Sequence, residues 1–455
     1  MKKGKSTGFW HIVDSLEGDK VIWMIVLLLI MISVLAISSS TSLLAVQQHI
    51  TRNSIIREQL LIVALGVALI VGMYNIRDIR IFKLIAESGY VLSIAALLFL
   101  KFRLNLGIIK AVNINGATRA ISVFGFQLHV FEFVKIMMIM YLAWAVDTLK
   151  RDGFTLANKF CRFEKLGFLA RKKWKEGLYI YMPIATVCLL ILNGSVSSTL
   201  FIGGMMFLTV MVGGLKFKTV IPYAVAAVVG FSLCIGLYYA SDGKIFGRIG
   251  TAVGRVTRHS EDPEEALLKY SRDTKEFQEA LDAARQPISA KVAIREGGIF
   301  GKGVGKSTQK YIVPIMFEDY MFSFIVEEYG LWGALLIMAL YASLVARGSL
   351  IVRNCDNHFA KTAVAGLVLL ISLQAFMHIM INADMGPLTG QTLPMISHGN
   401  SSFLAFSIAF GIILSISRMA KKRIDREADK AQPIISQTDE VADRMNELDQ
   451  LENIQ

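Results

Sequence analysis

The stretch PIMFEDYMFSFIVEEYGLWG, from Pro314 to Gly333, opens a long apolar segment with acidic residues at its mouth. Glu318 and Asp319 stand where the segment begins, and Glu327 and Glu328 follow further in. An ionised carboxylate is costly beside hydrocarbon, so acids placed here indicate either a functional site or a structural clamp. The choice between the two depends on what surrounds this stretch.

The composition predicts a membrane protein. The chain has 455 residues, of which 54% are hydrophobic and 18% charged, and a soluble domain carries more charge than this. A helix that crosses the hydrocarbon core needs about 20 apolar residues. We therefore predict an all-α polytopic membrane protein with about ten transmembrane helices. The predicted spans are approximately Val21–Ser38, Gln59–Tyr74, Leu84–Leu100, Phe131–Val146, Leu178–Leu192, Val196–Gly213, Thr219–Ala240, Met321–Val345, Thr362–Ile381 and Ser402–Ile416.

The basic residues predict the orientation of these spans. The net charge is +12, but the lysines and arginines recur between alternate spans, which indicates membrane topology and argues against nucleic-acid binding. The positive-inside rule then places both termini in the cytoplasm. Basic residues before the fourth span fall on the other face, and they are either a surface for an anionic ligand or an exception without function: Lys101, Arg103, Lys110 and Arg119.

This orientation divides the chain into three parts. Residues 1–20 form a cytoplasmic N-terminus whose acids argue against a cleaved signal peptide, and residues 21–418 form the transmembrane domain. The polar segment 419–455 is expected to be a disordered cytoplasmic tail. A large extracytoplasmic loop, 241–319, precedes the eighth helix, and we expect a surface helix at Glu261–Arg285. The four cysteines show neither a disulfide framework nor the spacing of a metal site.

Asp319 is the first candidate for chemistry. With Glu318 it either caps the following helix, where acids suit the helix dipole, or acts as a general base. A carboxylate at a half-dry boundary has a raised proton affinity and can take a proton from a sugar hydroxyl.

The second candidate is the glycine-rich run GGIFGKGVGKSTQK, Gly297 to Lys310. A nucleotide-binding phosphate loop needs a glycine where Phe300 stands, so the run is not that motif. Its backbone amides and lysines either cradle a phosphate or simply form tight turns. The residues in question are Lys302, Lys306, Gln309 and Lys310.

Two further segments carry polar groups near the predicted outer face. Glu132 and Lys135 are three residues apart on one helix face, where either charge alone would be costly, so they are predicted to pair. Arg119 is either a phosphate contact or a solvated loop residue.

The prolines and glycines of Asn382–Ser402 forbid a continuous helix, so this polar segment forms a site wall, a re-entrant loop or a simple outer loop. Its side chains include Thr389, Ser397, His398, Ser401 and Ser402.

In this order, the segments resemble the SEDS family of membrane glycosyltransferases, the FtsW/RodA/SpoVE group. The family pattern P-x-T-G-x-x-L-P-x-x-S-x-G-x-S-S is similar to Pro387–Ser402, and G-G-x-F-G-x-G-x-G-x-S-x-Q to Gly297–Gln309. The pattern around the essential aspartate of the family matches Pro314–Gly330. The N-G-A-x-R and E-x-x-K elements match Asn115–Arg119 and Glu132–Lys135. The resemblance covers about residues 18–418.

The resemblance implies an activity. Members of this family polymerise lipid II into glycan strands at the outer face of the bacterial cytoplasmic membrane, beside a class B penicillin-binding protein. Asp319 would deprotonate the acceptor 4-hydroxyl of lipid II, which would attack C1 of the growing strand and expel undecaprenyl pyrophosphate. Nearby cations, or a divalent ion such as Mg or Mn, would stabilise the diphosphate. No other cofactor is expected, and other divisome membrane proteins are expected partners.

The sequence also departs from the family pattern. Glu318 stands in place of a threonine, His398 in place of a tyrosine and Asn400 in place of a glycine. The compact loops and the Gly18-Asp19-Lys20 start favour an FtsW-like role in cell division. The alternatives are RodA-like elongation, which determines cell shape, and a lipid II flippase or transporter.

Overall fold

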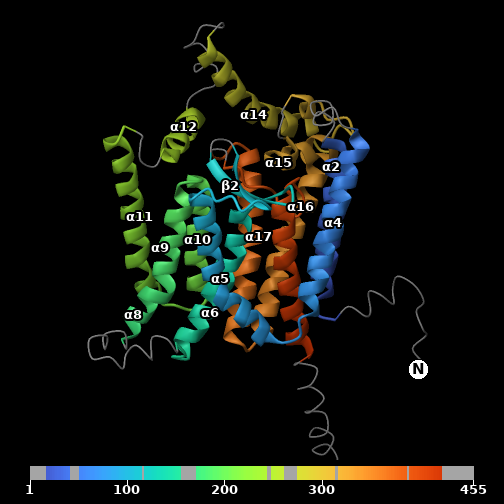
Figure 1. The fold of residues 1–455 in the computed structure, drawn as a ribbon. Coiled ribbons are helices and arrows are strands. Elements are labelled where there is room, and N and C mark those ends of the chain that lie inside the picture. The colour runs from blue at the N-terminus through green and yellow to red at the C-terminus, as the bar shows by residue number, and fades with distance from the viewer. Residues whose placement is uncertain are drawn as a thin grey trace, which may run out of the picture.

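The computed structural model describes residues 17–40, 51–114, 117–154, 171–242, 247–260, 274–312, 316–386 and 389–422. Most of the predicted N-terminal segment 1–20 and of the tail 419–455 lies outside these ranges. The described part is a bundle of long helices with smaller elements gathered at one end (Figure 1).

The prediction of a helical membrane protein is confirmed. Eight helices in the described ranges are long and apolar enough to cross a membrane, and α6 and α10 complete the expected set of about ten. α6 is not one of the eight, because Glu132, Lys135 and Asp147 interrupt its apolar sequence. The bundle consists of α2 (Lys20–Ser40), α4 (Arg52–Asn75), α5 (Ile79–Lys101), α6 (Val130–Lys150), α8 (Lys172–Glu176), the π-helical turn Gly177–Tyr181, α9 (Met182–Leu192), α10 (Val196–Val212), α11 (Phe217–Ala240), α16 (Met321–Asn354), α17 (His358–Asn382) and a last helix, Asn400–Lys422.

Several helices extend beyond their predicted ends. The second span begins at Arg52 rather than Gln59, the third at Ile79 rather than Leu84, and α16 continues past Val345 to Asn354. Hydropathy marks the apolar part of a helix, whereas backbone hydrogen bonds continue through polar residues that face the water.

The centre of the bundle is formed by α6, α17 and the last helix. Val146, Leu370 and Ile413 from these three helices are completely buried in one hydrophobic core. By contrast, α11 stands at the edge of the bundle, and only Val220 and Cys234 of its side chains are buried (Figure 1). An apolar helix with so few side chains buried against other helices is stable when its exposed surface contacts lipid.

The all-α prediction missed a small sheet. Strands β1 (Ile109–Ile114), β2 (Ala117–Val123) and β3 (Phe126–His129) form an antiparallel sheet in the order β1-β2-β3. Phe124 and Gly125 both have positive φ between β2 and β3, as a tight hairpin turn requires. The sheet places Arg119 and leads directly into α6. It also occupies part of the segment whose basic residues broke the charge rule.

The predicted loop before the eighth helix is largely helical. It contains α12 (Arg248–Ser260), α14 (Lys275–Gly297), the 3-10 turn Gln309–Tyr311 and α15 (Met316–Asp319). Residues 261–273 of the predicted surface helix lie outside the described ranges, and α14 continues past Arg285 through Pro287. Together with the sheet these elements lie at one end of the bundle, called the outer end below (Figure 1).

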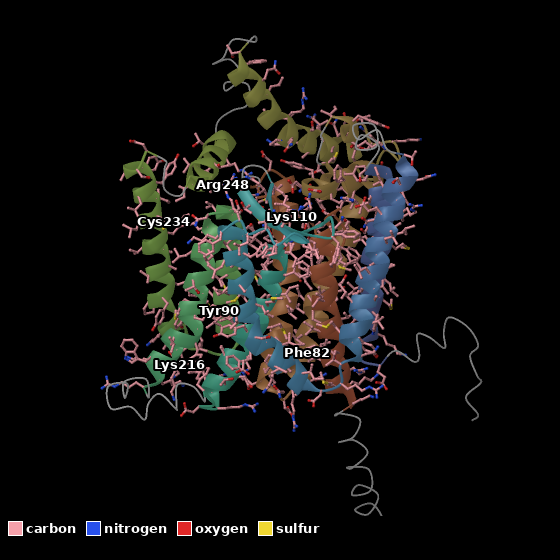
Figure 2. All side chains as sticks on the ribbon, in the orientation of Figure 1. Phe82, Tyr90, Lys110, Lys216, Cys234 and Arg248 are labelled. Atoms are coloured by element: carbon pink, nitrogen blue, oxygen red, sulfur yellow. The ribbon has the colours of Figure 1, made fainter. Side chains whose placement is uncertain are left out.

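Ion pairs join the helices at the opposite end. Arg347 binds Asp19 at 2.6 Å, Lys83 binds Asp147 at 2.6 Å, and the lysines of this end are those that the charge rule predicts to be cytoplasmic. Figure 2 shows Lys216 at this end and Lys110 and Arg248 at the outer end.

Candidate functional site

Asp319 lies at the junction of α15 and α16, at the outer end. Its side chain is half-buried, and its backbone carbonyl accepts a hydrogen bond from Asn382 Nδ2 at 3.1 Å. The carbonyl oxygen of the fully buried Asn382 side chain accepts in turn from the backbone amide of Ser323, at 2.9 Å, and from its hydroxyl, at 2.8 Å. The end of α17 therefore fixes the backbone from Asp319 to Ser323. Sequence reasoning did not single out Asn382 or Ser323.

The surroundings of Asp319 suit proton transfer. Burial raises the pKa of its carboxyl to about 7, the negative charge of Glu318 contributes to this, and the positive charge of Arg255 opposes it. A general base works best when its pKa lies near the working pH. Asp319 is therefore able to take up and release a proton near neutrality.

The polar segment before the last helix folds back onto α15. The Ser397 hydroxyl donates to the Glu318 carbonyl at 2.8 Å, and the His398 amide donates to the Phe317 carbonyl at 2.9 Å. The His398 ring also meets the Phe317 ring edge-on, with centroids 5.4 Å apart. Irregular backbone is thus held beside the aspartate by hydrogen bonds to protein, as it must be at membrane depth.

A cluster of buried polar side chains lies next to this polar segment. The predicted pair is confirmed: Lys135 Nζ lies 2.8 Å from Glu132 Oε1, and it also donates to Gln374 at 2.7 Å and to Gln391 at 3.3 Å. Lys135 is 2% exposed, so this cluster neutralises a charge within the protein. The two glutamines were not predicted, since Gln374 on α17 and Gln391 in the irregular segment after it show no spacing that marks them as partners.

Two serines of the closing segment are also held by protein. Ser401 Oγ accepts a hydrogen bond from the His129 amide at 2.8 Å, which ties the sheet to the last helix. The Ser402 hydroxyl lies 2.7 Å from that of Thr392.

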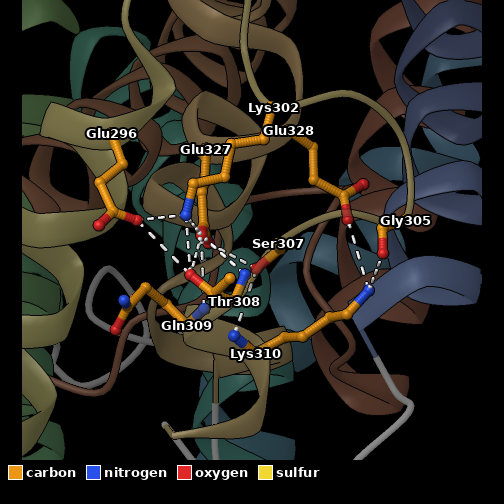
Figure 3. A network of polar contacts seen from close by, with 9 residues as sticks. All are labelled: Glu296, Lys302, Gly305, Ser307, Thr308, Gln309, Lys310, Glu327 and Glu328. Atoms are coloured by element: carbon orange, nitrogen blue, oxygen red, sulfur yellow. Dashed lines mark hydrogen bonds and ion pairs between the residues drawn. The ribbon is translucent and has the colours of Figure 1, made fainter.

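The glycine-rich run wraps around a carboxylate of this same chain (Figure 3). Glu327 is fully buried and accepts hydrogen bonds from Lys302 Nζ at 2.8 Å, from the Thr308 amide at 2.8 Å and from the Ser307 hydroxyl. The backbone amide of Gln309 also donates to Glu327, at 3.4 Å. The donors that resemble a phosphate cradle are therefore already occupied by a side chain of α16.

The neighbouring acid extends this clamp to the first helix. The Glu328 carboxylate accepts from the Ser39 hydroxyl at 2.6 Å and lies 3.7 Å from Lys310 Nζ, which also donates to the Gly305 carbonyl. Lys306 is exposed, and among the described residues its ammonium group contacts no side-chain partner. Lys306 is thus the lysine of this run that remains available to a ligand.

An apolar cavity of about 420 Å³ opens between α10, α12 and α17. Its lining includes Phe201, Met205 and Leu373, and its polar side chains, which suit an anionic ligand, are Ser197, Arg255 and Thr389. The Thr389 hydroxyl oxygen is buried and has no hydrogen-bond partner in the described part of the chain. Arg255 was not predicted, although the sequence of α12 places arginines among apolar residues on a short helix.

Arg119 lies near this cavity. Its Nε donates to the Gly194 carbonyl at 2.9 Å, and burial, together with the positive charges of Arg248 and Arg255, lowers its pKa to about 10. Guanidinium groups that repel one another over a short range attract an anion placed between them.

A metal ion has no evident protein ligands here. In the described ranges, no three His, Cys, Asp or Glu side chains gather in a way that could hold one. The expected divalent cation is therefore assigned no ligands and no step.

Comparison with known proteins gives the family. Residues 19–422 match the family model that covers FtsW, RodA and SpoVE, described as "Cell cycle protein". The chain belongs to this family. The probable peptidoglycan glycosyltransferase FtsW of Caulobacter vibrioides is 27% identical over 77% of this chain and 75% of the relative. Stage V sporulation protein E of Bacillus subtilis is 23% identical over 89% of this chain and 98% of the relative.

Solved structures show the same fold. A chain of a peptidoglycan synthase complex that coordinates polymerization and crosslinking aligns with a TM-score of 0.58 at 18% identity, over 89% of this chain and 98% of that one. The rod shape determining protein RodA of Thermus thermophilus aligns with a TM-score of 0.51 at 18% identity, with the same coverage. The helical membrane fold is thus shared by the SEDS proteins.

Proposed function

We propose that this chain polymerises lipid II into glycan strands at the outer face of the bacterial cytoplasmic membrane, with Asp319 as the general base. Membership of the FtsW/RodA/SpoVE family, whose relatives are named peptidoglycan glycosyltransferases, supports the reaction class. The observation that carries the role of Asp319 is its position. It is a half-buried carboxyl with a pKa raised to about 7, on a backbone fixed by Asn382, at the outer end of the bundle.

The proposed reaction begins with the acceptor 4-hydroxyl. Asp319 removes its proton, the oxygen attacks C1 of the lipid-linked strand, and the bond from C1 to the diphosphate breaks. The apolar cavity between α10, α12 and α17 fits part of a polyprenyl chain, because it excludes water from apolar surface. The arginines above it, Arg119, Arg248 and Arg255, carry the charge that the diphosphate needs.

The other predicted binding residues divide into two groups. Arg119, Lys306 and Thr389 remain candidates for direct contact with substrate. The remaining predicted residues are engaged with protein groups, so their proposed role is to shape the walls of the site: Glu132, Lys135, Lys302, Gln309, Ser397, His398, Ser401 and Ser402.

The proposed setting is a complex. The similar chain of a peptidoglycan synthase complex supports a class B penicillin-binding protein as partner. Lipid II and the undecaprenyl-pyrophosphate-linked glycan are the proposed substrates, and both termini are proposed to face the cytoplasm. A divalent ion such as Mg or Mn would help to stabilise the diphosphate. Other divisome proteins would join the complex if the enzyme acts in cell division.

The decisive experiment measures glycan polymers made from lipid II by the purified protein with its transpeptidase. We expect Asp319→Asn and Asp319→Ala to abolish polymer while the complex still assembles. The matched control is Asp384→Asn, which removes another carboxylate of the outer end, one that pairs with Lys291. Polymerisation by a correctly assembled Asp319→Asn complex would overturn the assignment.

The rival hypotheses have separate tests. A flippase would move lipid II across sealed vesicles without making polymer, and the proposed enzyme makes polymer on the side to which its outer end faces. Depletion of the protein distinguishes the two cellular roles: filamentous cells indicate cell division, as in FtsW, and rounded cells indicate elongation, as in RodA.

A further inference from the structure

Glu318 and His398 face each other beside Asp319. His398 Nδ1 lies 3.9 Å from Glu318 Oε1, and this nitrogen is buried with no hydrogen-bond partner in the described residues. The separation exceeds a hydrogen bond, but it is short enough for the ring to act on the carboxylate electrostatically. Glu318 is 43% exposed and His398 15% exposed, so the pair links the site to the outer solution.

Hydrogen bonds to backbone carbonyls hold the segments that carry Glu318 and His398 next to each other. The His398 amide donates to the Phe317 carbonyl, and Ser397 Oγ donates to the Glu318 carbonyl, so α15 and the 397–398 segment are joined on both sides of the pair. The edge-on contact between the Phe317 and His398 rings fixes the imidazole plane. The side chains therefore meet because the fold places them together.

The pair acts on Asp319 through charge. Glu318 precedes it directly in α15, and after burial the charge of Glu318 is the largest cause that raises the pKa of the Asp319 carboxyl. The His398 imidazole faces that carboxylate and screens part of its negative charge.

We propose that Glu318 and His398 are positioning residues through which this chain sets the ionisation of its general base, with His398 acting by way of Glu318. The inference rests on the proposed function of Asp319. It concerns two of the positions at which this sequence departs from the pattern it resembles, since threonine and tyrosine supply neither the carboxylate nor the imidazole.

Other charged groups also face this region, and their effect on the pKa of Asp319 is common to all the variants tested below. Arg255 of α12 opposes the effect of Glu318 on Asp319, and Asp384 after α17 acts on the adjacent Tyr320. Glu58 of α4 accepts a hydrogen bond from Asn400 at 3.4 Å. None of them is altered by the substitutions below.

The test is the pH profile of polymerisation by the complex. Glu318→Gln removes a negative charge, so Asp319 stays ionised to lower pH, and the acidic limb should move down by about half a pH unit or more. His398→Tyr removes the imidazole that screens Glu318, so the same limb should move up. The double variant should follow Glu318→Gln alone, because His398 then has no charge to screen.

The outcomes separate the two proposals. A merely structural role would lower the rate at every pH without moving the limb, and that result would overturn the inference. Equal displacement by His398→Tyr with and without Glu318→Gln would show that His398 acts directly on Asp319, and it would also overturn the route through Glu318. His398→Phe repeats the test with no hydroxyl. Failure of the proposed function would appear separately, as polymer formation by Asp319→Asn.

Discussion

The buried carboxylate of Glu327 accepts a hydrogen bond from the backbone amide of Thr308, 2.8 Å away. This contact joins the first turns of α16 to a loop that resembles a phosphate cradle, and it gives that loop a structural partner. The acids of the Pro314–Gly333 stretch thus have different roles. Glu327 and Glu328 form a clamp, whereas Asp319 lies exposed enough to meet a substrate.

Glu327→Ala should destabilise the protein by about 2–4 kcal/mol, because it leaves several buried donors of the glycine-rich run without an acceptor. Thermal unfolding in detergent micelles should show the loss. The control is Lys306→Gln in the same run, where the side chain is exposed and the midpoint should not move. Unchanged unfolding of Glu327→Ala would show that the clamp contributes nothing to stability.

Gly330→Ala should cost about 3 kcal/mol or more. Gly330 has φ 67° and ψ −163°, and an added Cβ would lie 2.3 Å from the Ile299 carbonyl oxygen. Gly72→Ala in α4 is the matched control, since its Cβ meets no atom within 4 Å and alanine favours a helix. The two variants should change the unfolding midpoint in opposite directions, and a normal midpoint for Gly330→Ala would contradict the tight packing.

Lys135→Met should destabilise the protein by about 3–5 kcal/mol, since it leaves Glu132 and two buried amides without their shared donor. The double variant Glu132→Gln with Lys135→Met should lose less, because no unpaired charge remains. A double-variant cycle of unfolding midpoints measures the coupling. Additive losses would mean that the two charges do not interact.

Asp319→Asn should be inactive and yet more stable than the wild type at pH 8. The raised pKa means that the folded protein binds a proton more tightly than the unfolded chain, so wild-type stability falls as pH rises from about 4 to about 7. The gain should therefore vanish near pH 4. Unfolding midpoints across this range check the sign, with Asp384→Asn as control. A constant difference at all pH values would exclude a raised pKa.

Arg119→Gln should raise the lipid II concentration for half-maximal rate about tenfold, as loss of one charged contact to a phosphate predicts. The exposed Arg103→Gln is the control on the same face. An unaltered concentration dependence would assign Arg119 to its structural bond with the Gly194 carbonyl.

The sequence by itself determined the membrane fold and the approximate positions of its spans, and it made Asp319 the candidate base. Long apolar runs and charge distribution are properties of the chain alone, because every backbone group in hydrocarbon must be satisfied within its own helix. The pairing of Glu132 with Lys135 also followed from spacing on one helix. Family motifs then distinguished Asp319 from the acids around it.

Only the tertiary structure decided which groups face one another across the chain. Asn382 reaches Asp319 across 63 positions, and Ser39 reaches Glu328 across 289. The sheet formed because Phe124 and Gly125 turn the chain back, a local signal obscured by the apolar surroundings. Whether the carboxylate of Glu327 or a ligand fills the glycine-rich run depends on helix packing that no local pattern encodes. The acids of one stretch were therefore visible in sequence, but the contacts that make Glu327 and Glu328 a clamp required the folded chain.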